Sequence, residues 1–152
     1  MDDRNCRRCF ITLKLFMRIF PEEISVRLDL KINTYDIDVA GHVNNAVFVQ
    51  WLEELRTKLF TEYFDLPGLL SKGIYPIVRT TEISFRKFLK VFDKPIGKMY
   101  IENIKHGIIT LNFVIELDGK ISAEGRQKCV LYNLQKSCLI KDSELQKLIA
   151  EG

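Results

Sequence analysis

The first regular pattern along the chain is a strict alternation of apolar and polar residues. Single polar residues separate the apolar positions Ile24, Val26, Leu28, Leu30 and Ile32. Successive side chains of a β-strand point to opposite faces, so this spacing places all of these apolar side chains on one face. The pattern predicts a strand over residues 24–32 with one face packed against a core.

A long helix is predicted next, because the apolar spacing changes to three or four residues from residue 46 onward. Its main apolar face is formed by Phe48, Leu52, Leu55, Leu59 and Tyr63. Charged residues such as Arg56 fill much of the remaining surface, but Val47, Val49 and Phe60 extend the apolar area beyond one face. We therefore expect a helix that other elements wrap, rather than one that rests on a flat surface.

Four further strands are predicted after breaks in the chain at Leu66-Pro67-Gly68 and Lys72-Gly73. Their approximate ranges are residues 77–85, 96–104, 108–117 and 121–134. Residues 105–107 form a candidate turn, and Asp118-Gly119 indicates a two-residue hairpin turn whose central residues both need positive φ. The last strands should therefore form an antiparallel meander, and the order of elements indicates an α+β fold.

Length and composition favour one globular domain, assigned to residues 23–140. The chain has 152 residues, of which 47% are hydrophobic and 28% charged, so it has enough apolar surface to build one core. A Ser-x-x-Gln capping pattern at Ser143 predicts a short C-terminal helix within residues 141–152. Residues 1–22 are predicted to be a dispensable extension, with Met17 as an alternative start.

The net positive charge of the chain comes from that extension. The formal net charge is +3, and the first 20 residues hold five basic and two acidic side chains, so the remainder is neutral. A neutral body argues against a nucleic-acid-binding domain, which needs clustered Lys and Arg. No apolar stretch reaches the roughly 18 residues of a membrane span, which excludes channels and transporters. A small molecule or a protein is the expected partner.

The four cysteines indicate free thiols rather than a metal site. Cys6 and Cys9 have CxxC spacing, but no second pair of ligands follows to complete a tetrahedral zinc site, so no metal is expected. The other two are Cys129 and Cys138. Free thiols are typical of a reducing compartment, so we expect a cytoplasmic protein.

The segment with the clearest chemistry is residues 35–45, between the first strand and the long helix. It places the Asp38 carboxylate on a loop directly before a helix N-terminus. The first N–H groups of a helix have no partner within the helix and carry partial positive charge, so they can stabilise an oxyanion. Asp38 and this helix start together have the parts needed to polarise a carbonyl and direct a nucleophile to it.

Residues 36–45 read Asp36-Ile37-Asp38-Val39-Ala40-Gly41-His42-Val43-Asn44-Asn45, and residues 51–56 read Trp51-Leu52-Glu53-Glu54-Leu55-Arg56. These two strings resemble the 4-hydroxybenzoyl-CoA thioesterase family of acyl-CoA thioesterases. The resemblance extends from about residue 23 to residue 132. It implies a hotdog fold, in which an antiparallel sheet wraps around one long central helix, and dimers that pair edge to edge with active sites at their interface. A homodimer or homotetramer is also expected because a wrapped sheet leaves unpaired edges.

The resemblance implies roles for particular residues in catalysis. Asp38 matches the catalytic carboxylate, and Asn45 matches the position whose backbone N–H faces the thioester oxygen. Gly41 matches the loop glycine, which would allow close backbone approach to the ligand. Some related enzymes place the carboxylate on the helix, which makes Glu54 the second choice. Attack by Asp38 itself, through a mixed anhydride, and activation of water by Asp38 both stay open.

Structural roles compete with catalytic ones at several positions. Asp38 could simply cap a turn, Asn44 is expected to cap the helix, and His42 is expected to position the loop or face solvent. His42 and Asn44 are kept as weak candidates for substrate binding. Glu53 and Glu54 are expected on a solvated or interface face.

A basic cluster of Arg86, Lys87 and Lys90 could meet the phosphates of coenzyme A, although a solvated surface is the simpler interpretation. The phenylalanines beside it, Phe85, Phe88 and Phe92, are expected in the core or at an interface. Phe88 stands where relatives often have proline, and Phe48 stands where they commonly have tyrosine. These departures affect the expected shape of the acyl pocket rather than the reaction.

We predict an acyl-CoA thioesterase that hydrolyses an acyl-CoA or acyl-carrier-protein thioester to a free acid and a thiol. No cofactor is expected, because coenzyme A belongs to the substrate and the protein groups supply the chemistry. The alternative is a non-catalytic acyl-CoA-binding hotdog module with a sensing or regulatory role, which would bind ligand without turnover. A hydratase on the same fold is less favoured, because its different Asp/His spacing is absent from the sequence.

Overall fold

The apolar alternation near the N-terminal end forms strand β1 (Ser25–Asp29) in the computed structural model, which describes residues 24–151. Val26 is buried between exposed neighbours, as the alternation predicts. β1 ends earlier than expected, because the chain then enters the short 3-10 helix η2 (Thr34–Asp36) that leads to the loop before the long helix. The predictions for residues 1–22, including Met17 and the Cys6/Cys9 pair, lie outside the described residues.

The long helix α2 covers Asn45–Phe64, close to its predicted span. It ends where Asp65 adopts a left-handed conformation with φ of 49°. Leu66-Pro67-Gly68 was expected only to break the chain, but these residues start a second short helix, α3 (Leu66–Ser71). Proline is tolerated there because the N–H groups of a first helical turn have no partner within the helix.

The strands form one antiparallel sheet in the order β1-β3-β4-β5-β2. The strands after the helices are β2 (Ile74–Phe85), β3 (Ile96–Lys105), β4 (Ile108–Leu117) and β5 (Lys120–Asn133). A two-residue strand, β6 (Cys138–Leu139), also pairs with β5. Because β3, β4 and β5 are neighbours in both sequence and space, the predicted meander is confirmed, and β1 and β2 lie at the sheet edges.

Two-residue turns join the strands of the meander. His106 and Gly107 have φ of 54° and 74°, and Asp118 and Gly119 have φ of 51° and 73°. Positive φ at both central positions is the type I′ geometry, whose twist matches that of the flanking strands. Both predicted turns are therefore confirmed. The Asp142 carboxylate also accepts hydrogen bonds from the backbone N–H groups of His106, at 2.9 Å, and Gly107.

The C-terminal helix α4 (Asp142–Glu151) begins slightly before the predicted cap at Ser143. Its Leu145 has no exposed surface and belongs to the same core cluster as the side chains of α2 and the sheet. The predicted helix is present, and it packs on the domain that precedes it.

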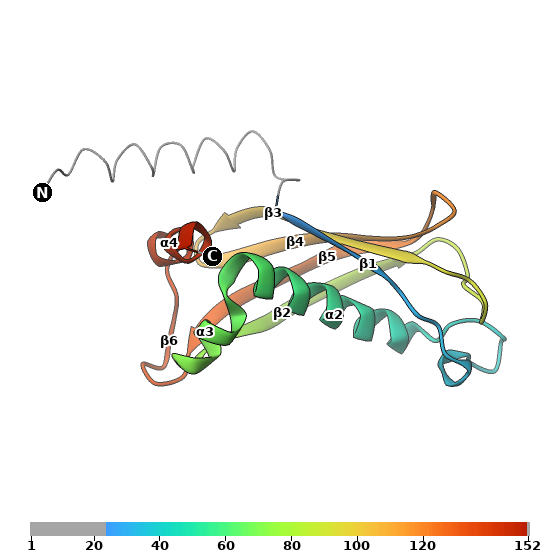
Figure 1. Ribbon diagram of the computed structural model, residues 1–152, viewed down its shortest axis with the longest axis horizontal. Helices are drawn as coiled ribbons and strands as arrows, with labels where there is room; N and C mark the ends of the chain where they lie inside the picture. The colour runs from blue at the N-terminus through green and yellow to red at the C-terminus, as the bar shows by residue number, and fades with distance from the viewer. Residues whose placement is uncertain (1–23, 152) are drawn as a thin grey trace, which may run out of the picture.

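Helix α2 lies along one face of the curled sheet (Figure 1), with α3 and α4 near one end and η2 near the other. Leu52, Leu55 and Leu59 of α2 have no exposed surface. Burial of each such side chain contributes about 2 kcal/mol, which fixes the helix against the sheet. The expected α+β architecture, an antiparallel sheet wrapped around one long helix, is confirmed.

Strand β2 contains one residue more than the part of β5 with which it pairs. The pairing register shifts between Val78 and Thr80, so Arg79 forms a β-bulge. Val78 and Ile83 both pack against the main core. Their numbers differ by five, and in a regular strand residues five apart point to opposite faces. The bulge therefore changes which residues of β2 point inward.

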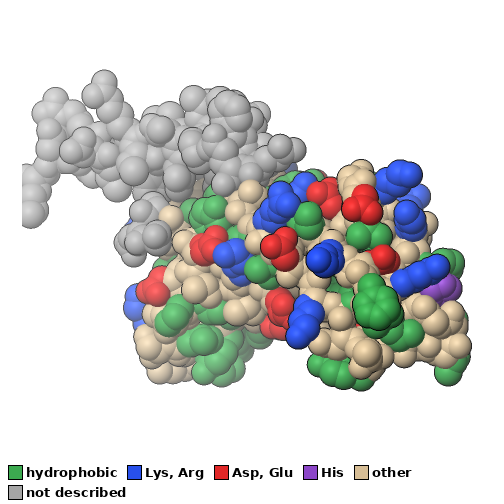
Figure 2. Space-filling model, turned by 45° about the vertical axis from the view of Figure 1, so that its right-hand side comes forward, with side chains coloured by type: hydrophobic (Ala, Val, Ile, Leu, Met, Phe, Trp, Pro, Cys, Tyr) green, Lys and Arg blue, Asp and Glu red, His purple; other side chains and the backbone are tan. Residues whose placement is uncertain are grey.

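Acidic and basic side chains are intermingled over the face of the molecule shown in Figure 2. This distribution agrees with the neutral charge of the chain after residue 20. Among residues 24–151, no helix is both long and apolar enough to cross a membrane.

Candidate active site

The loop between η2 and α2 is closed by its own backbone. Ile37 and Val43 form an isolated β-bridge. Inside this bridge the Asp38 N–H donates to the carbonyl of His42 at 2.9 Å, and the Gly41 N–H donates to the carbonyl of Asp38 at 3.0 Å. The loop is thus a small hydrogen-bonded hairpin that carries Asp38 to the start of α2.

The Asp38 carboxylate is only partly committed to this loop. Its Oδ1 atom accepts from the Ala40 N–H at 2.8 Å and from the His42 N–H at 3.4 Å. Its Oδ2 atom has no hydrogen-bond partner among residues 24–151. The turn-capping role weighed from the sequence is therefore present, and it leaves one carboxylate oxygen available to another molecule.

Gly41 is required by conformation. Its φ is +78°, a region in which a side chain causes strain, and an added Cβ atom would meet nothing within 4 Å. The open space beside it is compatible with the expected approach of a ligand, but the observed reason for glycine is the turn itself.

The first turn of α2 leaves one backbone donor free. The Asn44 side chain caps the helix by accepting from the Ala46 N–H at 2.9 Å, which confirms the predicted cap. The Val47 N–H donates to the carbonyl of Asn44 at 2.9 Å. Within the described part of the chain, the Asn45 N–H donates to no protein group. This donor stands where the sequence predicts the oxyanion contact.

His42 stacks on Phe88, with ring centroids 4.2 Å apart and ring planes 7° apart. The Val43 N–H also donates to the carbonyl of Leu89 at 2.9 Å, so the segment after β2 is tied to the Asp38 loop. This stack supports a positioning role for His42. Phe88 is 72% exposed and Phe92 is 90% exposed, so neither belongs to the core of this chain, and an interface role stays a prediction.

Phe48, Trp51 and Phe85 form an aromatic wall near the start of α2. Phe48 contacts Trp51 and Phe85 edge to face, each with ring centroids 5.1 Å apart. Phe48 and Trp51 are buried, but Phe85 of β2 is 45% exposed. The wall places an accessible apolar surface beside the helix start.

The basic cluster does not act as one unit. Arg86 forms an ion pair with Glu124 at 2.7 Å. Lys87 and Lys90 are exposed and form no ion pair with residues of the described part of the chain. The structure therefore favours a solvated surface role for Arg86. It leaves the two lysines free to contact the phosphates of a ligand.

Glu53 and Glu54 lie on different flanks of α2, because neighbouring helical positions are about 100° apart. Glu53 is ion-paired with Arg56 one turn later. Glu54 is exposed and projects from the flank that also carries Lys58, four residues further on. The two glutamates are therefore not interchangeable as candidate carboxylates.

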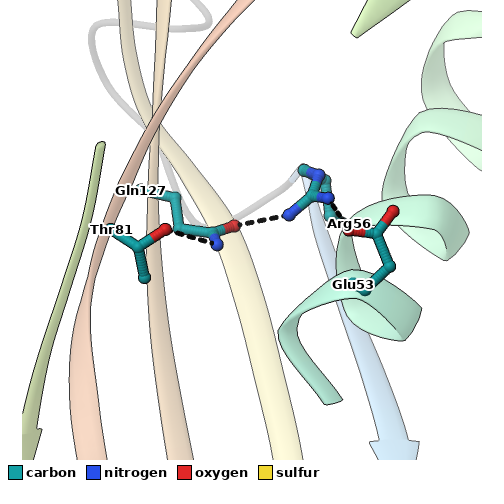
Figure 3. Close-up of polar contacts among 4 residues, drawn as sticks. All are labelled: Glu53, Arg56, Thr81 and Gln127. Atoms are coloured by element: carbon teal, nitrogen blue, oxygen red, sulfur yellow. Dashed lines mark hydrogen bonds and ion pairs between the residues drawn. The ribbon is translucent and has the colours of Figure 1, made fainter. Parts of the chain in front are cut away.

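A buried polar chain links α2 to the sheet, and sequence reasoning missed it (Figure 3). Arg56, expected on the surface, is 8% exposed, and Gln127 of β5 is 2% exposed. Arg56 donates to Gln127 Oε1 at 3.1 Å, and Gln127 Nε2 donates to the Thr81 hydroxyl at 3.0 Å. The sequence signal for these contacts is that Leu52, Leu59 and Phe60 lie three or four positions from Arg56, which places the arginine among apolar side chains of the helix.

This buried region also contains Cys129. Burial raises the pKa of its thiol from 9.0 to about 11, and the nearby positive charge of Arg56 offsets only part of that effect. Cys129 is therefore a protonated structural side chain at neutral pH. No group of three or more His, Cys, Asp or Glu side chains is placed to hold a metal within residues 24–151.

Comparison with known proteins finds a matching family and solved structures with the same fold. The model of the thioesterase-like superfamily matches residues 32–150. A probable thioesterase, YbaW, from Escherichia coli is 19% identical, with a TM-score of 0.69, and the match covers 82% of this chain and 98% of that protein. A DHNA-CoA thioesterase from Staphylococcus aureus is 13% identical, with a TM-score of 0.73 and coverage of 84% and 89%.

A thioesterase from Thermus thermophilus, solved in complex with coenzyme A and zinc, is 19% identical, with a TM-score of 0.69 and coverage of 83% and 92%. A search of curated proteins finds no match. The structural likenesses confirm the expected fold.

Proposed function

The chain belongs to the thioesterase-like superfamily, and we propose that it hydrolyses acyl-CoA thioesters with Asp38 as the catalytic carboxylate. Family membership confirms the expected enzyme class, a thioester hydrolase. The proposal adds the catalytic residue, the oxyanion donor and the class of substrate.

One observation carries this proposal. Neither Asp38 Oδ2 nor the Asn45 N–H has a hydrogen-bond partner among residues 24–151. Asp38 lies inside the loop closed by the Ile37–Val43 bridge, and Asn45 follows this loop by two residues. A thioester needs one group to bring the nucleophile and one to stabilise the oxygen, and these two groups have those properties.

The reaction then follows from ordinary acyl-transfer chemistry. The thioester oxygen accepts a hydrogen bond from the Asn45 N–H, which stabilises the negative charge that develops on it. Either water deprotonated by Asp38 or the Asp38 carboxylate itself forms a bond to the carbonyl carbon. The carbon–sulfur bond breaks and the thiolate leaves. In the water route the thiolate takes up the proton that Asp38 removed from water, and in the second route it takes up a proton from solvent. In the second route, water then hydrolyses the mixed anhydride and restores Asp38.

The thiol component of the substrate is proposed to be coenzyme A. Lys87 and Lys90 are exposed cations in the segment that is tied to the Asp38 loop through Leu89. Such cations suit the phosphates of coenzyme A. A related thioesterase of the same fold binds coenzyme A, which supports this choice over a carrier protein.

The main test is Asp38→Asn, which keeps the shape of the side chain but removes the anionic base or nucleophile. Turnover, followed as release of free thiol from a panel of aromatic and aliphatic acyl-CoA substrates, should fall by about a hundredfold or more. Ligand affinity, measured by calorimetry with a non-hydrolysable analogue, should change little.

Glu54→Gln is the matched control, because Glu54 is an exposed carboxylate of α2 with no assigned catalytic contact. It should cost less than about tenfold in turnover. If Glu54→Gln abolishes hydrolysis while Asp38→Asn does not, the catalytic carboxylate lies on the helix. If the unchanged protein binds acyl-CoA but hydrolyses none of the panel, the binding-module alternative replaces the enzyme.

A further inference from the structure

Two neighbouring turns at one end of the molecule carry apolar residues at their tips. The first turn covers residues 38–41 and has Val39-Ala40 at its centre, and the second covers residues 90–93 and has Val91-Phe92 there. Each is closed by a hydrogen bond of 3.0 Å from the N–H of its last residue to the carbonyl of its first. The centre of a turn usually holds Gly, Pro, Asn, Asp or Ser, so two apolar pairs at such positions require an explanation.

The side chains at these tips hardly pack on their own chain. Val39 is fully exposed and Phe92 is 90% exposed. The two turns adjoin each other, because the Val43 N–H of the first loop donates to the carbonyl of Leu89 at 2.9 Å. With the exposed Phe88, they place three apolar side chains on two adjoining segments. Exposed apolar groups gathered in this way mark a surface that another molecule covers.

Basic side chains lie beside these apolar ones. Residues 85–95 include four basic residues and one acidic residue. Lys94 belongs to this segment, and Lys31 adjoins it, because the Leu30 N–H donates to the carbonyl of Pro95 at 2.9 Å. Both lysines are exposed, and neither forms an ion pair with another residue of the range 24–151. Apolar and basic side chains lie next to each other at the right-hand end of the molecule in Figure 2.

We propose that this end of the molecule binds the surface of an anionic lipid bilayer, with Val39 and Phe92 entering the interface and Lys31 and Lys94 contacting lipid phosphates. The shape of the surface favours lipid over a protein partner. Apolar side chains on convex turn tips need a matching groove in a protein, whereas the soft interface of a bilayer closes around them. Apolar side chains combined with lysines are also the composition of segments that lie in an anionic interface.

This contact would place the candidate active site at the lipid surface, because Asp38 directly precedes Val39. Each buried methylene strengthens the partition of an acyl chain into a bilayer, so long-chain acyl thioesters concentrate there. Such a substrate would reach the Asp38 loop from the lipid phase. This consequence rests on the proposed function, whereas the binding of lipid does not.

The first test is sedimentation of the full chain with lipid vesicles. The protein should bind vesicles of phosphatidylcholine mixed with phosphatidylglycerol more tightly than vesicles of phosphatidylcholine alone, and added salt should weaken the binding. Phe92→Ser should weaken it by about tenfold or more, because the phenyl ring is no longer buried in the interface. Lys94→Gln should weaken it by about fivefold.

Leu134→Ser is the matched control. Leu134 is also an exposed apolar residue at a turn, but it follows the far end of β5. This variant should bind the mixed vesicles as the parent protein does. A parent protein that does not bind them, or a Phe92→Ser variant that binds them as well as the parent, would overturn the proposal.

The second test measures insertion with the variant Phe92→Trp. On addition of mixed vesicles its fluorescence should shift to shorter wavelength, and brominated lipid should quench it. The native Trp51 is buried, so its signal is measured on the parent protein and subtracted. Leu134→Trp should show neither change. Binding without a shift or quenching at position 92 would contradict insertion of this tip.

The same variants separate lipid from other occupants. Light scattering without lipid should give Phe92→Ser the same mass as the parent protein. A lower mass would make the tips a contact between copies of the chain, and binding of an acidic carrier protein instead of vesicles would assign the surface to a protein partner. Either result contradicts the proposal. None of these measurements uses catalytic activity, so their outcome is separate from that of the proposed function.

Discussion

The first turn of α2 and the middle of α2 use polar groups in opposite ways. At the first turn, Asp38 Oδ2 and the Asn45 N–H have no partner among residues 24–151. In the middle, Arg56 and Gln127 are almost fully buried and bond to each other, with Glu53 and Thr81 at the two ends of the chain. One region is open to another molecule, and the other is closed on itself.

This difference indicates which polar groups serve folding and which are free for a ligand. A buried donor or acceptor that loses its partner costs about 1–3 kcal/mol, so the buried chain has to be satisfied within the protein. At the exposed loop, water can satisfy the free groups until a ligand replaces it. We therefore expect substitutions in the middle of α2 to change stability, and substitutions in the loop to change activity.

The largest effect on stability is expected from Arg56→Met, which keeps an unbranched side chain but removes the guanidinium. Gln127 then loses its donor in a buried site, so the free energy of unfolding should fall by about 2 kcal/mol. Urea denaturation measures this change. Lys58→Met, in the more exposed ion pair with Glu62, is the matched control and should cost less than about 0.5 kcal/mol. Equal losses in the two variants would contradict the distinction between the regions.

A smaller, pH-dependent effect is expected from Cys129, beside the same buried chain. Burial raises the pKa of its thiol from 9.0 in the unfolded chain to about 11 in the folded protein. Well below pH 9 the thiol is protonated in both states and adds no pH dependence. Above that value the unfolded chain loses the proton first, so stability should fall as pH rises, by about 1 kcal/mol at pH 10. Cys129→Ala should show a flatter decline in denaturation midpoints between pH 8 and about 10.

In the loop, Gly41→Ala should cost about 1 kcal/mol, because the side chain is strained at a φ of +78° although it meets no neighbour. Turnover should also fall under conditions in which the variant is fully folded, since this loop carries Asp38. Gly41→Asn is the control, because asparagine adopts positive φ more readily than alanine. If both variants retain full turnover and lose only stability, the loop geometry is not needed for the reaction.

The smallest effect is expected from removing the residues before Met17. They carry two of the three net positive charges, and the first predicted strand starts after them. A chain that starts at Met17 should keep the melting temperature and turnover of the full chain. A clear drop in either measurement would assign residues 1–16 a packing or catalytic role.

The fold was accessible from the sequence wherever local and tertiary preferences agree. The alternation around Val26 predicts a strand, and Asp118-Gly119 predicts a hairpin turn. Both are present. The short helix α3 was not predicted, because Pro67 and Gly68 favour a break by local propensity. There the Asp65 side chain, which accepts from the Gly68 N–H, outweighs propensity.

The candidate site divides in the same way. The Asn44 cap and the position of Asp38 depend on near neighbours in the chain, so their pattern can be read from the sequence. The contact between Arg56 and Gln127 joins residues 71 positions apart, and no local pattern encodes it. The stack of His42 on Phe88 was missed for the same reason.

The two type I′ turns have a consequence for the order of folding. Each joins adjacent strands through two residues, so β3, β4 and β5 form contacts that are local in sequence, and hairpins of this kind close in about 1–10 μs. Strand β2 pairs with β5, from which it is separated in the sequence by both β3 and β4. Closing this longer loop costs more conformational entropy, so we expect β2 to join the sheet after the meander has formed. We therefore expect substitutions at the Arg79 bulge to speed unfolding and to leave the rate of folding nearly unchanged.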